Sequence, residues 1–258
     1  MSNTIHASAS VSAKAELGDN NVIGALVCID DDVHLGEGNT LMQGVVLKPG
    51  TRLGDNNTIH EYVVLGGLPQ DLGFDGRPSG VTIGSGNTLR EYVTINRATR
   101  DGGATLLGDN NYLMTQVHLG HDCCLADQVI IAPGSGLGGH VRVAERAFIS
   151  GGVMVHQFVE VGTLAMVGGN AKITQNVLPY MITDGIPARV HGLNLVGLKR
   201  AGVELEEIRN LKRAYNTIHR SGQSHEVIVR HLREQPGPHS HHLADFIASA
   251  KRGFHREK

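Results

Sequence analysis

Four histidines fall within one stretch of the chain, and an aspartate directly follows one of them. The histidines are His118, His121, His140 and His156, and the aspartate is Asp122. A neutral imidazole with an ordinary pKa of about 6.5 is a competent general base at physiological pH. A carboxylate beside it can fix the imidazole tautomer and stabilise the imidazolium that forms. These residue types therefore suggest proton abstraction from a substrate, provided that the fold brings them together.

A repeat of six residues is the element that positions these side chains. An aliphatic residue recurs at every sixth position, which fits neither the 3.6-residue period of a helix nor the two-residue period of a half-buried strand. A period this short predicts a hexapeptide β-helix, in which three hexads, each a short strand and a corner, close one triangular coil. The aliphatic residues are Ile5, Val11, Leu17, Ile23, Ile29, Leu35, Leu41, Leu47, Leu53, Ile59 and Leu65, then Ile83, Leu89 and Ile95, then Leu107, Leu113, Leu119, Leu125, Ile131, Leu137, Val143, Ile149, Val155, Val161, Val167 and Ile173.

Residues eighteen apart stack vertically in such a coil, with rungs about 4.8 Å apart. The stacking predicts two neighbouring columns at one corner: His121, Gly139 and Gln157 in the first, and Asp122, His140 and Phe158 in the second. Glycine lets a carbonyl group approach the backbone closely, and a backbone N–H there can donate to a developing oxyanion. The corner therefore has the parts of an acyl-transfer site.

Two other interpretations of the histidines stay open at this point. Corner histidines can satisfy local hydrogen bonds or pack at an interface between subunits. Three histidines from adjacent coils can also hold zinc, as in the hexapeptide-coil carbonic anhydrases. The spacing of His118, His121 and His140 does not match the arrangement in that family, so no metal site is predicted.

Composition and charge exclude several classes of function. The chain has 258 residues, a formal net charge of −2 and 40% hydrophobic residues, which suits a soluble globular protein and gives no support to nucleic-acid binding. No apolar run is long enough to span a membrane, and the N-terminus lacks the form of a signal peptide. The three cysteines, Cys28, Cys123 and Cys124, are expected to be free thiols in a reducing cytoplasm.

The end of the hexads divides the chain into two predicted domains, a β-helix over residues 1–190 and a helical domain over residues 191–258. Two breaks, Leu68–Gly80 and Arg97–Thr105, interrupt the hexads without shifting their phase. Loops that leave a rigid scaffold often carry function, although surface decoration is the plainer alternative.

The C-terminal part has the three-to-four-residue spacing of helices. One helix is predicted to end at Ser221-Gly222, a second to cover Glu226–Arg233 and a third Leu243–Lys251. The segment Pro236-Gly237-Pro238 is expected to be a linker, and the histidine-rich tract at residues 239–242 a loop. Basic side chains in this part form either a solvated helix face or a docking patch for an acidic partner. They are Lys199, Arg200, Arg209, Lys212, Arg213 and Arg220.

At several motifs the sequence resembles the UDP-N-acetylglucosamine O-acyltransferases of lipid A biosynthesis, the LpxA type. A hexapeptide repeat alone is shared by many transferases, whereas this set of motifs in this order is specific. The similarity runs over nearly the whole length. The motifs are Pro69-Gln70-Asp71-Leu72, Arg90-Glu91-Tyr92-Val93-Thr94-Ile95, His118-Leu119-Gly120-His121-Asp122, Gly138-Gly139-His140-Val141, Val155-His156-Gln157-Phe158 and Asn194-Leu195-Val196-Gly197-Leu198-Lys199-Arg200.

The resemblance implies a mostly β fold, a left-handed parallel β-helix of hexapeptide repeats with a C-terminal α-helical domain. It implies a homotrimer that moves a 3-hydroxyacyl chain from acyl carrier protein to the 3-hydroxyl of UDP-N-acetylglucosamine, without a cofactor. His121 is the implied general base, Asp122 its orienting partner and Gly139 the oxyanion donor. The implied substrate contacts are Asp71, His118, His140, His156, Gln157, Gly169, Asn194 and Arg200.

Four of these contacts have an implied partner in the substrates. Asp71 matches the sugar-binding aspartate of the family, and Asn194 and Arg200 match its contacts to the nucleotide and phosphates. Gly169 stands where the family sets acyl-chain length, and a glycine there leaves room for a long chain. The basic tail would dock the acidic carrier protein.

The sequence departs from the family pattern in the residues that surround the acceptor. Where the family has lysine, histidine, histidine, glutamate and arginine, this chain has Gly73, Asn96, Pro187, Val196 and Ala201. A lost buried polar contact costs about 1–3 kcal/mol, so these changes can retune the acceptor. The alternatives are therefore a different nucleotide sugar, an acyl-CoA donor, or a non-catalytic trimeric paralogue.

Overall fold

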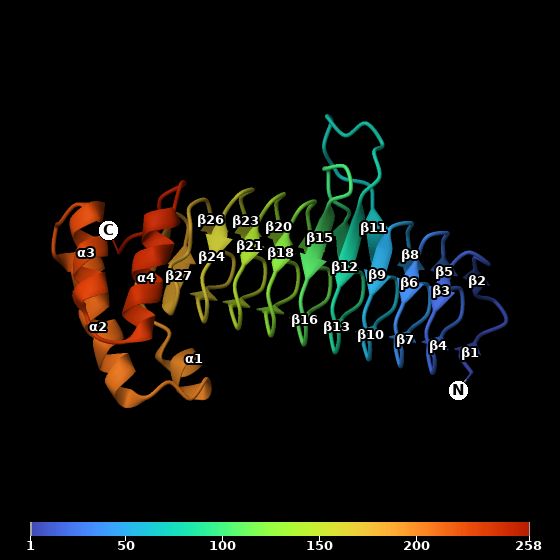
Figure 1. Ribbon diagram of the computed structural model, residues 1–258, viewed down its shortest axis with the longest axis horizontal. Helices are drawn as coiled ribbons and strands as arrows, with labels where there is room; N and C mark the ends of the chain where they lie inside the picture. The colour runs from blue at the N-terminus through green and yellow to red at the C-terminus, as the bar shows by residue number, and fades with distance from the viewer. Residues whose placement is uncertain (1, 258) are drawn as a thin grey trace.

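The computed structural model describes residues 2–257 and forms a long triangular prism with helices at one end (Figure 1). Three parallel sheets make the faces of this left-handed β-helix, as the hexads and the resemblance predict. The first sheet contains β1 (Thr4–Ile5), β4 (Val22–Ile23), β7 (Thr40–Leu41), β10 (Thr58–Ile59), β13 (Thr88–Leu89), β16 (Tyr112–Leu113), β19 (Ile130–Ile131), β22 (Phe148–Ile149), β25 (Met166–Val167), β27 (Met181–Gly185) and the antiparallel β28 (Ala188–Leu193).

The other two faces are built from strands of the same kind. The second sheet contains β2 (Ser10–Val11), β5 (Cys28–Ile29), β8 (Val46–Leu47), β11 (Val64–Gly67), β14 (Thr94–Asn96), β17 (His118–Leu119), β20 (Gly136–Leu137), β23 (Met154–Val155) and β26 (Lys172–Ile173). The third sheet contains β3 (Glu16–Leu17), β6 (His34–Leu35), β9 (Thr51–Leu53), β12 (Gly80–Ile83), β15 (Ala104–Leu107), β18 (Cys124–Leu125), β21 (Arg142–Val143) and β24 (Glu160–Val161).

Strand register confirms the eighteen-residue stacking and the constant phase of the hexads. His118 pairs with Gly136 one rung above, and Gly136 pairs with Met154. The two breaks leave the prism as loops on the same side, and pairing resumes in phase after each of them (Figure 1). Thr58 accordingly pairs with Thr88 across the first break, so the loops add length to a coil without rotating it.

The hexad aliphatics fill the prism interior in a single cluster that runs from Ile23 to Ile173. The first coil is the least covered: Ile5 is 47% exposed, and no helix formed by residues 2–257 lies over the N-terminal end of the prism (Figure 1). A coil cannot bury its own apolar face, so each one depends on a neighbour above or below. The core is therefore sealed at the helical end and open at the other.

The Gly-Asp-Asn-Asn motifs form the turn between the third and the first sheet, as predicted. Asn20, Asn56 and Asn110 have φ values of 60°, 56° and 55°, in the left-handed region that asparagine tolerates. The next residue in each motif points inward and is buried. These inward residues stack as a ladder that we call the asparagine corner: Asn21, Asn39, Asn57, Asn87 and Asn111.

Four helices close the chain: α1 (Leu195–Arg200), α2 (Leu205–Arg220), α3 (His225–Glu234) and α4 (Pro238–Ser249). The ends predicted for the first two long helices are confirmed to within about one residue. A second apolar cluster joins these helices to β27 and β28. The domain division at residue 190 falls inside β28 and stays a prediction.

The start predicted for the last helix is wrong. The helix begins at Pro238 rather than Leu243, so the histidine tract at residues 239–242 lies in its first turns and not in a loop. Proline is well tolerated at the first helical position, because its missing N–H would have no partner there and its φ already suits a helix. Over residues 2–257 no helix is both long and apolar enough to cross a membrane.

Candidate active site

The turns between the second and the third sheet bring the predicted columns together; we call the turns at Gly120–Asp122, Gly138–His140 and His156–Phe158 the histidine corner. The His140 N–H donates to the His121 carbonyl at 2.9 Å, and the Phe158 N–H donates to the Gly139 carbonyl at 3.0 Å. Asp122, His140 and Phe158 all have φ near +60°. The corner therefore repeats on three rungs with side chains in register.

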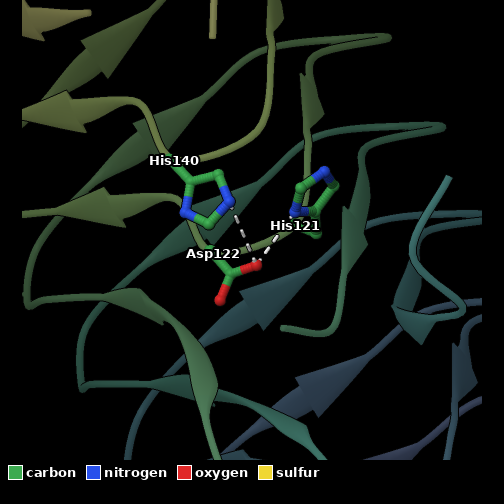
Figure 2. Close-up of side chains that lie close together, drawn as sticks. All are labelled: His121, Asp122 and His140. Atoms are coloured by element: carbon green, nitrogen blue, oxygen red, sulfur yellow. Dashed lines mark hydrogen bonds and ion pairs between the residues drawn. The ribbon is translucent and has the colours of Figure 1, made fainter. Parts of the chain in front are cut away.

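His121 and Asp122 form a hydrogen-bonded pair at this corner. The Nδ1 atom of His121 lies 2.9 Å from Asp122 Oδ2, and only 12% of the imidazole and 4% of the carboxylate are exposed (Figure 2). An ionised carboxylate can only accept, so His121 Nδ1 carries the proton and donates it. The Nε2 atom of His121 is then left with a free lone pair, as a general base requires.

Asp122 is held by groups from the second break as well as by His121. The Thr99 N–H and hydroxyl donate to Asp122 Oδ2 at 3.0 and 2.7 Å, and the Asp122 N–H donates to Thr105 Oγ1 at 2.8 Å. Burial alone would raise the pKa of the Asp122 carboxyl, but the hydrogen bonds from His121 and Thr99 outweigh it and hold the pKa below its ordinary value. The carboxylate is therefore ionised at neutral pH.

Gly139 is next to the base atom. A Cβ built on Gly139 would lie 2.5 Å from both Cε1 and Nε2 of His121, so only glycine leaves room for the ring in this position. The Gly139 N–H meets no hydrogen-bond acceptor among residues 2–257. A free backbone donor therefore lies on the residue that contacts the imidazole.

His140 closes the other side of Asp122. Its Nε2 lies 3.8 Å from Asp122 Oδ2, and its ring stands at 89° to that of His121 (Figure 2). The His140 ring also stacks on Phe158, with ring centroids 4.5 Å apart. Burial lowers the pKa of His140, although the Asp122 carboxylate partly opposes this effect. The ring is therefore expected to be neutral at pH 7 and available as a polar contact.

The remaining histidines of the cluster lie near the corner but do not touch His121. His118 accepts or donates a hydrogen bond with Thr94 Oγ1 at 2.8 Å, and burial lowers its pKa. His156 lies two rungs above His121, where its Nδ1 is 3.1 Å from the Gln157 carbonyl and 3.4 Å from the Arg252 guanidinium. Both positions agree with the predicted column order, and neither residue is tied to Asp122.

Asp71 lies in the first loop. The charge of its carboxylate opposes the lowering of the His140 pKa by burial. The Gly73 N–H donates to Asp71 Oδ1 at 2.7 Å, so a backbone group occupies one oxygen of this carboxylate. Asn96 donates to the Leu68 carbonyl at 2.6 Å and thereby ties the loop to the coil.

Three predicted contacts lie away from the histidine corner in this single chain. Asn194 and Arg200 line a groove of about 620 Å³ against outward side chains of the first sheet, together with Val196 and Ala201. The Asn194 carboxamide is occupied: it accepts from the Gly197 N–H and donates to the Leu164 carbonyl, both at 2.9 Å. Gly169 is exposed at a different corner, where an added Cβ would meet nothing closer than 3.6 Å.

The same cluster also contains three potential metal ligands. His121, Asp122 and His140 each offer one ligand atom, and these atoms lie within 4.8 Å of one another. However, Asp122 Oδ2 already receives three hydrogen-bond donors, from His121 and twice from Thr99. A donor set filled in this way fits proton transfer better than ion binding.

Sequence reasoning did not identify three groups at this site. Thr99 lies in the second break of the hexads, Arg97–Thr105, but nothing in the sequence predicts its contact with Asp122. Arg142 and Arg252 line a cavity of about 610 Å³ that opens beside Asp122 and His140. Arg142 follows the corner by two residues and was within reach of the stacking argument, whereas Arg252 arrives only through the docking of the C-terminal segment.

Comparison with known families gives two matches. The family model described as Udp N-acetylglucosamine O-acyltransferase, domain 2, matches residues 176–255. The model of the bacterial transferase hexapeptide, six repeats, matches residues 32–67. The two matches fall on the helical end and on the prism, respectively.

Curated relatives and solved structures are named as acyltransferases of UDP-N-acetylglucosamine. Acyl-[acyl-carrier-protein]--UDP-N-acetylglucosamine O-acyltransferase of Thiobacillus denitrificans is 41% identical over 256 residues, 98% of this chain and 99% of that protein. The protein of that name from Gloeothece citriformis is 42% identical over 185 residues, 71% of this chain and 67% of the relative. The solved structure of LpxA, a UDP-N-acetylglucosamine acyltransferase from Bacteroides fragilis, superposes with a TM-score of 0.94 at 34% identity and covers 97% of this chain and 99% of its own.

Proposed function

The chain belongs to the family of UDP-N-acetylglucosamine O-acyltransferases, and from this premise we propose that it catalyses the first step of lipid A biosynthesis. It moves a 3-hydroxyacyl chain from acyl carrier protein to the 3-hydroxyl of UDP-N-acetylglucosamine. The observation that carries the proposal is the His121–Asp122 hydrogen bond of 2.9 Å, which leaves the Nε2 lone pair of His121 against Gly139.

Proton transfer begins the reaction in this proposal. His121 Nε2 takes the proton of the sugar 3-hydroxyl while the hydroxyl oxygen attacks the thioester carbonyl carbon. Asp122 keeps the proton on Nδ1 and stabilises the imidazolium that forms, as a buried carboxylate does beside a catalytic histidine. The tautomer required at the start is the one that the Asp122 contact favours.

Stabilisation of the oxyanion follows from the position of Gly139. As the carbonyl becomes tetrahedral, its oxygen gains negative charge, and the free Gly139 N–H donates to it. The intermediate then collapses, the carbon–sulfur bond breaks, and the imidazolium returns its proton to the thiolate of the carrier protein. The products are the O-acylated sugar nucleotide and free carrier-protein thiol, and no cofactor enters the balance.

Assembly and partners complete the proposal. Asn194 and Arg200 line an open groove against apolar side chains of the first sheet, which supports a homotrimer in which a neighbouring prism completes the acceptor site. The acidic carrier protein and the UDP-sugar are the proposed partners. Three free cysteines support a reducing, cytoplasmic setting.

A mass-spectrometric assay tests the activity and the acceptor together. Purified protein is incubated with UDP-N-acetylglucosamine and a panel of 3-hydroxyacyl carrier proteins, with acyl-CoA in parallel. We expect a mass gain of one hydroxyacyl group with a carrier-protein donor and none with acyl-CoA. If product formed only with another nucleotide sugar, that sugar would be the acceptor. We would then attribute the changed acceptor specificity to Gly73 and Asn96.

A non-catalytic role has its own signature in the same assay. UDP-N-acetylglucosamine that binds without product, from any donor, would contradict the proposed activity. Light scattering measures the assembly, and a mass of three chains is expected.

A further inference from the structure

One oxygen of Asp122 receives three donors, and two of them belong to a residue outside the hexads. Besides His121 Nδ1, Oδ2 accepts from the Thr99 backbone N–H and from the Thr99 hydroxyl. We propose that Thr99 is a positioning residue for acyl transfer, which holds the Asp122 carboxylate in place against His121. The inference rests on the proposed function and adds a residue to its machinery.

Thr99 is itself held firmly, because its loop is anchored on both sides. The Ala98 N–H donates to the Gly80 carbonyl at 3.2 Å, and the Gly102 N–H donates to the Pro78 carbonyl at 2.8 Å. The Gly103 N–H closes the turn by donating to the Arg100 carbonyl at 2.9 Å. A donor fixed in this way needs no reorganisation at the moment of reaction, which is what makes preorganised groups effective.

The second oxygen of Asp122 shows why positioning is needed. Oδ1 is buried and accepts no hydrogen bond within residues 2–257; its nearest cation is Arg100, whose Nε lies 3.8 Å away. The terminal torsion of aspartate is soft, so the carboxylate can rotate unless something distinguishes its two oxygens. Thr99 does so by placing both donors on Oδ2, the oxygen that faces His121.

The hydroxyl also sets how strongly Asp122 holds the proton of His121. Each donor on Oδ2 withdraws charge from the oxygen and weakens its pull on the imidazolium. Loss of the Thr99 hydroxyl should therefore move the acid limb of the pH–rate profile to higher pH.

Other charges face the pair, and they are the same in every variant compared below. His140 Nε2 lies 3.8 Å from Oδ2, Arg100 lies near Oδ1, and Asp71 acts on His140 from the first loop. The cavity beside Asp122 adds Arg142 and Glu160 from the third sheet and the cations Lys251 and Arg252 from the C-terminal segment. A difference between Thr99 variants thus reports the hydroxyl alone.

The kinetic test compares Thr99→Val, which keeps the shape and loses the hydroxyl, with Thr99→Ser, which restores it. We expect kcat of Thr99→Val to fall about tenfold, the value of one hydrogen bond to a charged group. KM should change little, and the acid limb of kcat/KM should move to higher pH. Thr99→Ser should return both to wild-type values.

A second measurement does not depend on turnover. In protein labelled with ¹³C at histidine, the His121 signal, assigned by its loss in His121→Gln, is titrated by NMR in the wild type and in Thr99→Val. The control is Thr105→Val, which removes the acceptor of the Asp122 N–H and leaves the carboxylate untouched. It should lower the melting temperature without moving the His121 titration.

The outcomes separate the two proposals. A wild-type titration curve and wild-type kcat in Thr99→Val would overturn the role of Thr99, as would a loss of activity that follows the melting temperature while the titration stays in place. If the wild type formed no product but the titration shifted in Thr99→Val, the proposed function would be refuted and the positioning role of Thr99 would be retained. Should Thr99→Val not fold, Thr99→Ala carries the same comparison.

Discussion

Two corners of the prism share a backbone and differ in what their side chains do. The asparagine corner turns its polar groups inward: Asn57 is 1% exposed, accepts the Asn87 N–H at 2.9 Å and donates to Asn39 at 2.9 Å. The histidine corner leaves a lone pair on His121 and a donor on Gly139 unused. The asparagine side chains have hydrogen-bond partners and serve the structure, whereas the histidine corner keeps polar groups free to act on a substrate.

The largest difference between the two corners is expected for a substitution of His121. His121→Ala should lower turnover by about a thousandfold or more, since a general base contributes on this scale. The ring fills no part of the prism core, so the melting temperature should change little. Initial rates and thermal unfolding of the same preparation check both statements, and near-normal turnover would remove His121 from the mechanism.

Gly139→Ala tests whether the empty space at the histidine corner is needed. The added methyl carbon would lie 2.5 Å from His121 Nε2 and must displace the ring. Displacement of a catalytic group by about 1 Å costs about a hundredfold in rate. The double variant with His121→Ala should be no slower than His121→Ala alone, because Gly139→Ala keeps the backbone N–H and acts through the displaced ring. Additive losses would show that the methyl group also blocks the position of the oxyanion.

Asn57→Ala applies the opposite change at the asparagine corner. It leaves the Asn87 N–H and side chain without their acceptor in the core, which should cost about 2 kcal/mol of unfolding free energy. Turnover per folded molecule should stay normal at low temperature. Asn56→Gly is the matched control, since Asn56 is exposed at φ 56° and glycine accepts that conformation; equal destabilisation by both would argue against the ladder.

The smallest expected effect is in the pH dependence of stability. Burial lowers the pKa of His140 in the folded protein below its ordinary value. The contribution of the neutral ring to the free energy of unfolding is therefore fully present above about pH 6.5 and is lost as the pH falls below that value. His140→Gln should therefore flatten the fall in melting temperature between pH 7 and 5. Asn57→Ala should leave that slope as it is; a slope unchanged by His140→Gln would show that His140 is no more buried than in the unfolded chain.

The sequence predicts the histidine corner because the hexad period fixes the register. Once residues eighteen apart stack, the positions of Gly139 and His140 above His121 and Asp122 follow without further information. Thr99 lies where the period is interrupted, so no register argument reaches it. Arg252 and the start of α4 depend on how the helices dock, which is decided by packing between segments distant in the chain.

The resemblance supplied what spacing alone cannot. Asn194 and Arg200 lie apart from His121 in the single chain, and their assignment to the substrate comes from the family motif. The hydrogen bond from the Asn194 carboxamide to the Leu164 carbonyl was not foreseeable, because Leu164 lies on a rung of the prism rather than in the motif.

The uncovered end of the prism has a consequence for assembly. Within residues 2–257, β1, β2 and β3 are the last strands of their sheets, so their outer N–H and C=O groups form a template for another extended chain. Strands of two residues, one of them carrying Glu16, make that template a poor one. The helices cover the opposite end, so end-to-end polymerisation is blocked from one side, and removal of the helical cap would expose a second edge and favour fibrous aggregates.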